Sequence, residues 1–84
     1  EDPASLLYAI GRAGRRQDRS AIGHLVQALE HDDPAVRMMA INALERLTGE
    51  RLGYNPYSSQ RLRHAMVKVW VEAVNQGRFE TDER

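Results

Sequence analysis

The chain has 84 residues, with 12 basic and 12 acidic side chains and no cysteine. This length predicts a single domain with a small core, and zero formal net charge excludes a general electrostatic attraction to nucleic acid or to an anionic membrane. The lack of cysteine excludes disulfides and thiolate metal sites, and no apolar run is long enough to span a bilayer. We expect a protein outside the membrane, in the cytoplasm by default.

The first half of the chain predicts two amphipathic helices. The first covers residues 3–13 and is opened by Asp2-Pro3, a pair that typically begins a helix. A polar connection follows, and Asp18 is a suitable N-cap for a second helix over residues 19–31. The apolar stripe of the second helix consists of Ile22, Leu25, Val26 and Leu29 at i, i+3, i+4 and i+7.

The third predicted helix, residues 34–48, has the clearest boundaries in the chain. Asp33 can accept a backbone N–H as N-cap, Pro34 occupies the first helical position, and Gly49 is a plausible C-terminal stop. Its apolar stripe consists of Val36, Ala40, Ala43, Leu44 and Leu47. Because only residues 31–33 separate it from the preceding helix, we expect the two to form an antiparallel hairpin.

A turn-rich loop, residues 49–58, precedes the last predicted helix over residues 59–76. Tyr54 and Tyr57 in this loop predict a lid whose rings cover the end of the core. The predicted stripe of the last helix consists of Leu62, Ala65, Met66, Val69, Trp70, Ala73 and Val74, with Val67 and Val71 off it. Trp70 is its expected packing anchor, and we expect the polar tail, residues 78–84, to be frayed.

Two stretches of the chain resemble each other: residues 9–14 and residues 43–48 align at an offset of 34. Periods of this size in helix pairs are typical of helical solenoids. Residues 18–49 resemble the short bacterial HEAT-like repeats first noted in phycobilin lyases. The matching residues are Ala28, Leu29, Asp33, Pro34, Val36, Arg37, Ala40, Ala43 and Leu44. The resemblance implies an all-α fold, a short right-handed α-solenoid of about four helices, with residues 59–76 as a closing element.

Several residues are expected to have structural roles. They are Asp33, Pro34, Arg37, Leu44 and Trp70, with Asp33 and Arg37 at i, i+4 for capping and pairing. The chain has no phosphate loop, nucleophile elbow or metal-binding His pair, and its three histidines lack ligand spacing. We therefore expect no catalytic residue, no cofactor and no metal site, although His31, Asp32 and Asp33 could bind a metal adventitiously.

The expected function is that of a non-catalytic protein-interaction scaffold. The second helices of successive repeats line the concave, partner-binding face of a solenoid. On that face the sequence places Tyr8, Met38, Asn42 and Glu45, with Ile41 at its edge. The alternative is that Met38 and Ile41 merely pack against adjacent helices.

Three other functions remain open. A basic cluster of Arg12, Arg15, Arg16 and Arg19 could bind phosphate or nucleic acid, which zero net charge disfavours. The chain could be an accessory domain of a lyase-like enzyme, which would require a deep polar pocket between helices. It could also self-associate through exposed ends of the array, with Leu7 at one end and Val67 or Val71 at the other.

Overall fold

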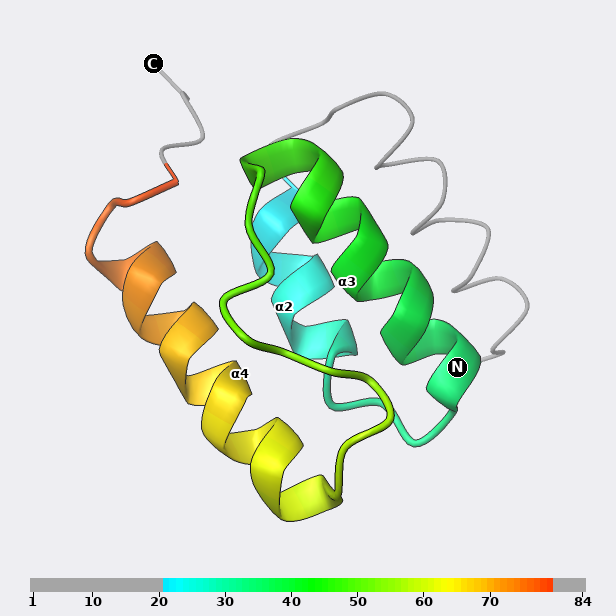
Figure 1. Ribbon diagram of the computed structural model, residues 1–84. Helices are drawn as coiled ribbons and strands as arrows, with labels where there is room; N and C mark the ends of the chain where they lie inside the picture. Colours follow the sequence, from blue (N-terminus) through cyan, green and yellow to red (C-terminus); the bar gives the residue numbers. More distant parts are fainter. Residues whose placement is uncertain (1–20, 80–84) are drawn as a thin grey trace.

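A computed structural model describes residues 21–79, and this part of the chain is all-helical, without any strand. It contains α2 (Ile22–Ala28), α3 (Pro34–Thr48) and α4 (Gln60–Asn75) (Figure 1). The all-α fold class is confirmed. The helix expected over residues 3–13 lies outside the described residues, so the fourth helix and the handedness of the solenoid remain predictions.

Helix α3 has the boundaries that its capping residues dictate. The Asp33 side chain accepts a hydrogen bond from the Ala35 N–H at 2.9 Å, and Pro34 begins the helix. At the other end Gly49 adopts a left-handed conformation with φ 81° and donates its N–H to the Glu45 carbonyl. Such a conformation is inexpensive only for glycine, so the helix stops there.

Helix α2 is shorter than the range 19–31 expected for it. Its regular hydrogen bonding ends at Ala28 because the N–H groups of Leu29, Glu30 and His31 each bond to the carbonyl three residues earlier. This tighter 3₁₀-type pattern closes the last turn and leads the chain directly into the connection to α3. The two helices form the expected hairpin.

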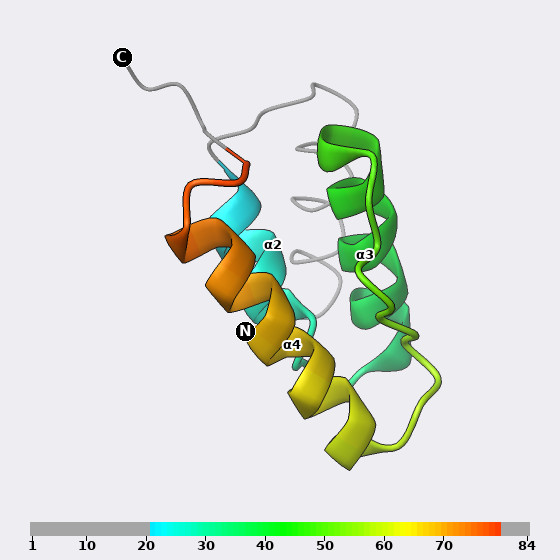
Figure 2. The same cartoon turned by 60° about the vertical axis from the view of Figure 1, so that its left-hand side comes forward.

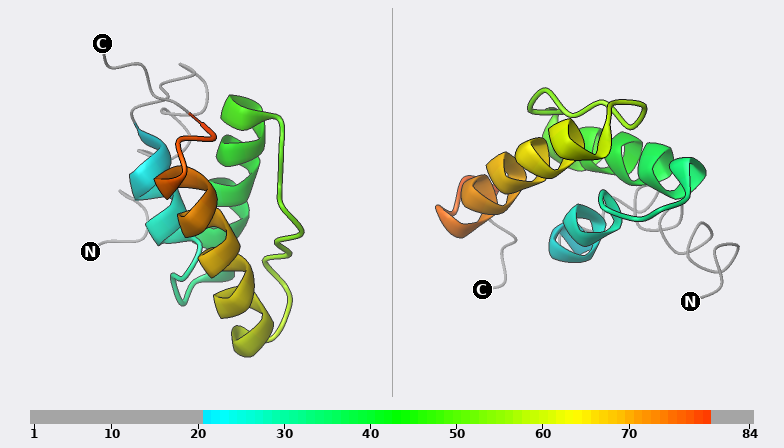
Figure 3. Two further views of the ribbon diagram at one scale, coloured as in Figure 1. Left: turned by 90° about the vertical axis from the view of Figure 1, so that its left-hand side faces the viewer. Right: turned by 90° about the horizontal axis from the view of Figure 1, so that it is seen from below.

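The three helices do not alternate in direction along the chain. In Figure 1, α2 runs downward and α3 runs upward, and the loop after α3 returns the chain to the lower end before α4 begins. Helix α4 therefore runs antiparallel to α2 and in the same direction as α3, as the side view in Figure 3 also shows. The loop between α3 and α4 therefore runs the full length of the helices. In a regular helical array, a helix would connect the two ends in its place.

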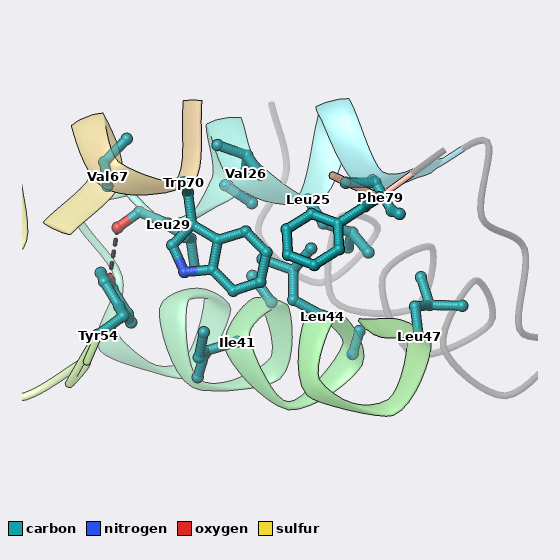
Figure 4. Packing of buried hydrophobic residues seen from close by; sticks show 14 of the residues in the cluster. Leu25, Val26, Leu29, Ile41, Leu44, Leu47, Tyr54, Val67, Trp70 and Phe79 are labelled. Carbon is teal, nitrogen blue, oxygen red and sulfur yellow. Dashed lines mark hydrogen bonds between the residues drawn. The ribbon is translucent and has the colours of Figure 1, made fainter. Parts of the chain in front are cut away.

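The core lies between the three helices and is filled from all of them. Leu29, Leu44 and Trp70 are fully buried, and Trp70 is the largest of the fully buried side chains. Figure 4 shows the indole ring between the α2 leucines and the α3 side chains. The predicted α3 stripe is buried throughout, and Ile41, expected at the edge of the outer face, is also fully buried.

The face of α4 that packs into this core differs from the predicted one. Leu62 and Val69, predicted to be core residues, are 56% and 40% exposed, whereas Val67, predicted to lie off the stripe, is only 7% exposed. The buried row of α4 is centred on Trp70, so the helix is rotated relative to the prediction. Val67 is therefore unavailable for the self-association expected at the end of the array.

The start of the C-terminal tail is packed, contrary to the expectation that residues 78–84 fray. Gly77 adopts φ 75° and turns the chain back. Phe79 is then buried against Trp70, with ring centroids 5.4 Å apart, and Arg78 donates two hydrogen bonds to the Glu50 carboxylate at 2.9 and 2.8 Å. An aromatic pair and an ion pair from Arg78 Nη2 thus hold residues 78 and 79 against the rest of the fold.

Candidate protein-interaction surface

The outer side of α3 carries three of the four residues predicted to form the binding face. Asn42 and Glu45 are exposed, and Met38 is half-buried. Tyr8, the fourth, lies outside the described residues. Since Ile41 belongs to the core, the outer face of α3 is narrower and more polar than the sequence indicated.

Arg51 completes this face, and sequence analysis missed it. Its Nη1 donates to Glu45 Oε1 at 2.6 Å and to Asn42 Oδ1 at 3.3 Å. Arg51 lies beyond Gly49, whose left-handed turn brings the chain back alongside α3. The sequence predicted the end of the helix at Gly49, but it did not predict the path of the loop that follows. We call Asn42, Glu45 and Arg51 the polar triad.

Arg37 holds the inner side of the same helix in place. Its side chain is buried, and Nη1 donates to the His31 and Asp32 carbonyls, each at 2.9 Å, while Nε donates to the Pro56 carbonyl at 3.1 Å. The expected pairing of Arg37 with Asp33 does not form, because the guanidinium instead bonds backbone carbonyls of the hairpin and of the loop. Asp33 retains only its predicted capping role.

The loop is also fixed by two aromatic donors of the core. The Tyr54 hydroxyl donates to the Leu29 carbonyl at 2.6 Å, and Trp70 Nε1 donates to the Arg51 carbonyl at 3.1 Å. Burial raises the pKa of Tyr54, and the nearby positive charges of Arg37 and Arg63 oppose that shift only in part. Tyr57 is 69% exposed, so only one of the two tyrosines expected in the lid covers the core.

The predicted basic cluster cannot be placed. Arg12, Arg15, Arg16 and Arg19 all lie outside the described residues, so nucleic-acid or phosphate binding through them remains a prediction.

Among the described residues, an open groove between α2 and α4 can be compared with the deep polar pocket that an accessory lyase domain would need. It has a volume of about 180 Å³ and is lined by Gly23, Val26, Gln27, Val71, Val74 and Asn75. None of these side chains can transfer a proton near neutral pH, so the groove offers binding volume but no acid or base.

The acidic turn before α3 is engaged in backbone capping. His31 Nδ1 accepts a hydrogen bond from the Asp33 N–H at 3.0 Å, and the Asp33 carboxylate accepts one from Ala35. Within residues 21–79, no group of three or more acidic or histidine side chains could hold a metal ion, and no helix there is long and apolar enough to cross a membrane.

Comparison with known proteins identifies the repeat. A family model described as HEAT repeats matches residues 1–75, most of the chain. No curated protein and no solved structure matches the sequence significantly.

Proposed function

Since the chain belongs to the HEAT repeat family, we propose that it is a non-catalytic protein-binding module that uses the outer side of α3. HEAT repeats generally act as scaffolds that bind other proteins. The proposed surface consists of Met38, Asn42 and Glu45 with Arg51, extended by Tyr8 on the preceding repeat.

The polar triad is the observation that carries this proposal. Arg51 cross-links two exposed side chains of α3, while the opposite side of that helix is buried in the core. Side chains held in one geometry before binding lose little conformational freedom when a partner arrives. Figure 2 shows α3 with the returning loop alongside it, so two segments contribute to one surface.

The proposal is tested with two matched substitutions of exposed amide side chains. Asn42→Arg alters the triad on α3, and Gln27→Arg makes the same chemical change on α2. Neither side chain is buried, so each variant should unfold within about 0.5 kcal/mol of the parent chain. Asn42 is a better position for this test than Met38, because Met38 is half-buried and its replacement would change the stability of the fold as well as binding.

Affinity capture from cells with the three baits provides the measurement, with retained proteins quantified by mass spectrometry. We expect a set of proteins retained by the parent chain and by Gln27→Arg, and reduced about tenfold on Asn42→Arg. Equal retention on all three baits, or selective loss on Gln27→Arg, would show that the outer side of α3 is not the binding surface.

A further inference from the structure

Helix α4 exposes a row of apolar side chains that nothing in the described structure covers. Leu62 is 56% exposed, Val69 is 40% exposed, and Ala65 between them is also exposed. Positions i, i+3 and i+7 lie on one side of a helix, so these three residues form a continuous strip that we call the α4 stripe. Half-buried Met66 borders it toward the core.

Scattered exposed apolar residues are ordinary on a protein surface, but a continuous strip along one helix commonly marks a contact surface. Figures 1 and 2 place α4 at the edge of the molecule, with one side away from α2 and α3. Within the described residues, the exposure of Leu62, Ala65 and Val69 leaves the stripe accessible to another chain.

Three exposed charged residues lie along one side of the α4 stripe, namely Arg61 at its start, Lys68 in its middle and Glu72 at its end. Arg61 and Glu72 are both exposed and are eleven positions apart. At 3.6 residues per turn that is about three turns, so the two side chains lie on the same side of the helix, roughly 16 Å apart. Neither forms an ion pair with any residue between 21 and 79.

This arrangement is self-complementary. When two α4 helices pack antiparallel with Ala65 of one opposite Val69 of the other, Arg61 of each copy lies within one position of Glu72 of its partner. A two-fold axis then produces two equivalent ion pairs at the ends of an apolar strip, with Lys68 of each copy at the rim beside the axis. A parallel arrangement would instead bring like charges together at both ends.

We propose that the α4 stripe is a homodimerisation surface and that its occupant is α4 of a second copy of this chain. The proposal does not depend on the function assigned to α3, which lies elsewhere on the surface. Zero formal net charge means that no long-range repulsion opposes the approach of two copies.

The size of the surface predicts a weak, reversible dimer. Helix α4 has 16 residues and is therefore about 24 Å long. Contact along a single helix of this length falls at the small end of specific interfaces, where complexes are transient. Dissociation in the micromolar to millimolar range is the expected outcome.

The first experiment is sedimentation equilibrium of the whole chain from about 10 μM to about 1 mM, spanning the affinities expected for a transient interface. The variant Val69→Asp is compared with Val71→Asp, which changes an equally exposed valine, 43% against 40%, on another side of α4. We expect the dimer to be weakened at least tenfold by the first change and to persist with the second.

The second experiment exploits the symmetry of the ion pairs. Arg61→Glu alone and Glu72→Arg alone each place two pairs of like charges in the homodimer and should each weaken it by about tenfold. An equimolar mixture of the two variants restores both opposite-charge pairs in the heterodimer. Association should therefore return in the mixture, with circular dichroism showing that each variant is folded.

Several results would overturn the proposal. If the chain remains monomeric at the highest concentration, it does not self-associate through α4. The α4 stripe would then have to contact a different protein. A dimer that is lost with Val71→Asp but kept with Val69→Asp uses the α2–α4 groove instead. Failure of the mixed charge variants to associate more tightly than either alone excludes the antiparallel register.

Discussion

Replacing Arg37 by methionine should destabilise the fold more than any surface substitution, because this side chain joins the hairpin to the returning loop. Methionine keeps most of the buried volume and removes the three donor contacts to the carbonyls of His31, Asp32 and Pro56. The loss in the free energy of unfolding therefore reports the missing hydrogen bonds rather than a new cavity.

The magnitude follows from the surroundings of each acceptor. A hydrogen bond from a charged donor contributes about 1.5 to 3 kcal/mol when both groups are buried, and much less where water replaces the donor. Only the contact to Pro56 is fully buried, and the other two are partly buried. Removing the guanidinium also relieves the cost of burying its charge. We expect a net loss of about 3 kcal/mol, which lowers the thermal midpoint of a domain this size by roughly 12 to 24 °C.

Urea unfolding followed by the fluorescence of Trp70, the only tryptophan, measures this loss directly. Arg46→Met makes the same change at an exposed position of α3 and should cost less than about 0.5 kcal/mol. The proposed role of Arg37 fails if the two variants unfold at the same urea concentration, or if Arg37→Met matches the parent chain.

Two further predictions concern the core. Leu44→Ala should reduce the free energy of unfolding by about 2 to 5 kcal/mol, because Leu44 is fully buried and a cavity remains; a smaller loss in the same urea assay would mean that the site collapses or is loosely packed. The pKa of Tyr54 is raised above the ordinary value of 10.0. Just above pH 10.0 the Tyr54 hydroxyl therefore stays protonated in the folded chain, whereas the same group ionises in the unfolded chain. Stability from this group is fully present below pH 10.0 and is lost as the pH rises through the higher folded pKa. Urea midpoints measured from about pH 8 to about pH 11 should fall more steeply for the parent chain than for Tyr54→Phe, and parallel curves would refute this.

The parts of the fold that were predictable are those fixed by neighbours in sequence. The ends of α3 depend on Asp33, Pro34 and Gly49, which act within one turn of the helix, and the structure gives the range that these residues indicated. The end of α2 was missed because the change to 3₁₀-type bonds after Ala28 carries no capping residue that marks it.

The face of α4 was not predictable because its sequence offers two overlapping apolar rows through Trp70. One row continues through Val69 and Leu62, and the other through Val67. Periodicity alone favours the longer row. Trp70 decides between them in the structure, since its Nε1 must reach the Arg51 carbonyl while its ring packs on Phe79. Both of these partners lie outside the helix.

The direction of α4 is explained by the length of the connection before it. Residues 49–59 separate α3 from α4, and an extended chain of this length reaches about 35 Å at roughly 3.3 Å per residue. Helix α3, with 15 residues, is only about 22 Å long. The loop can therefore traverse the whole molecule, and the donors of Arg37 and Trp70 hold it along that path. A short turn would have forced α4 antiparallel to α3. Loop length thus permits the observed arrangement, and buried side-chain donors to backbone carbonyls select it.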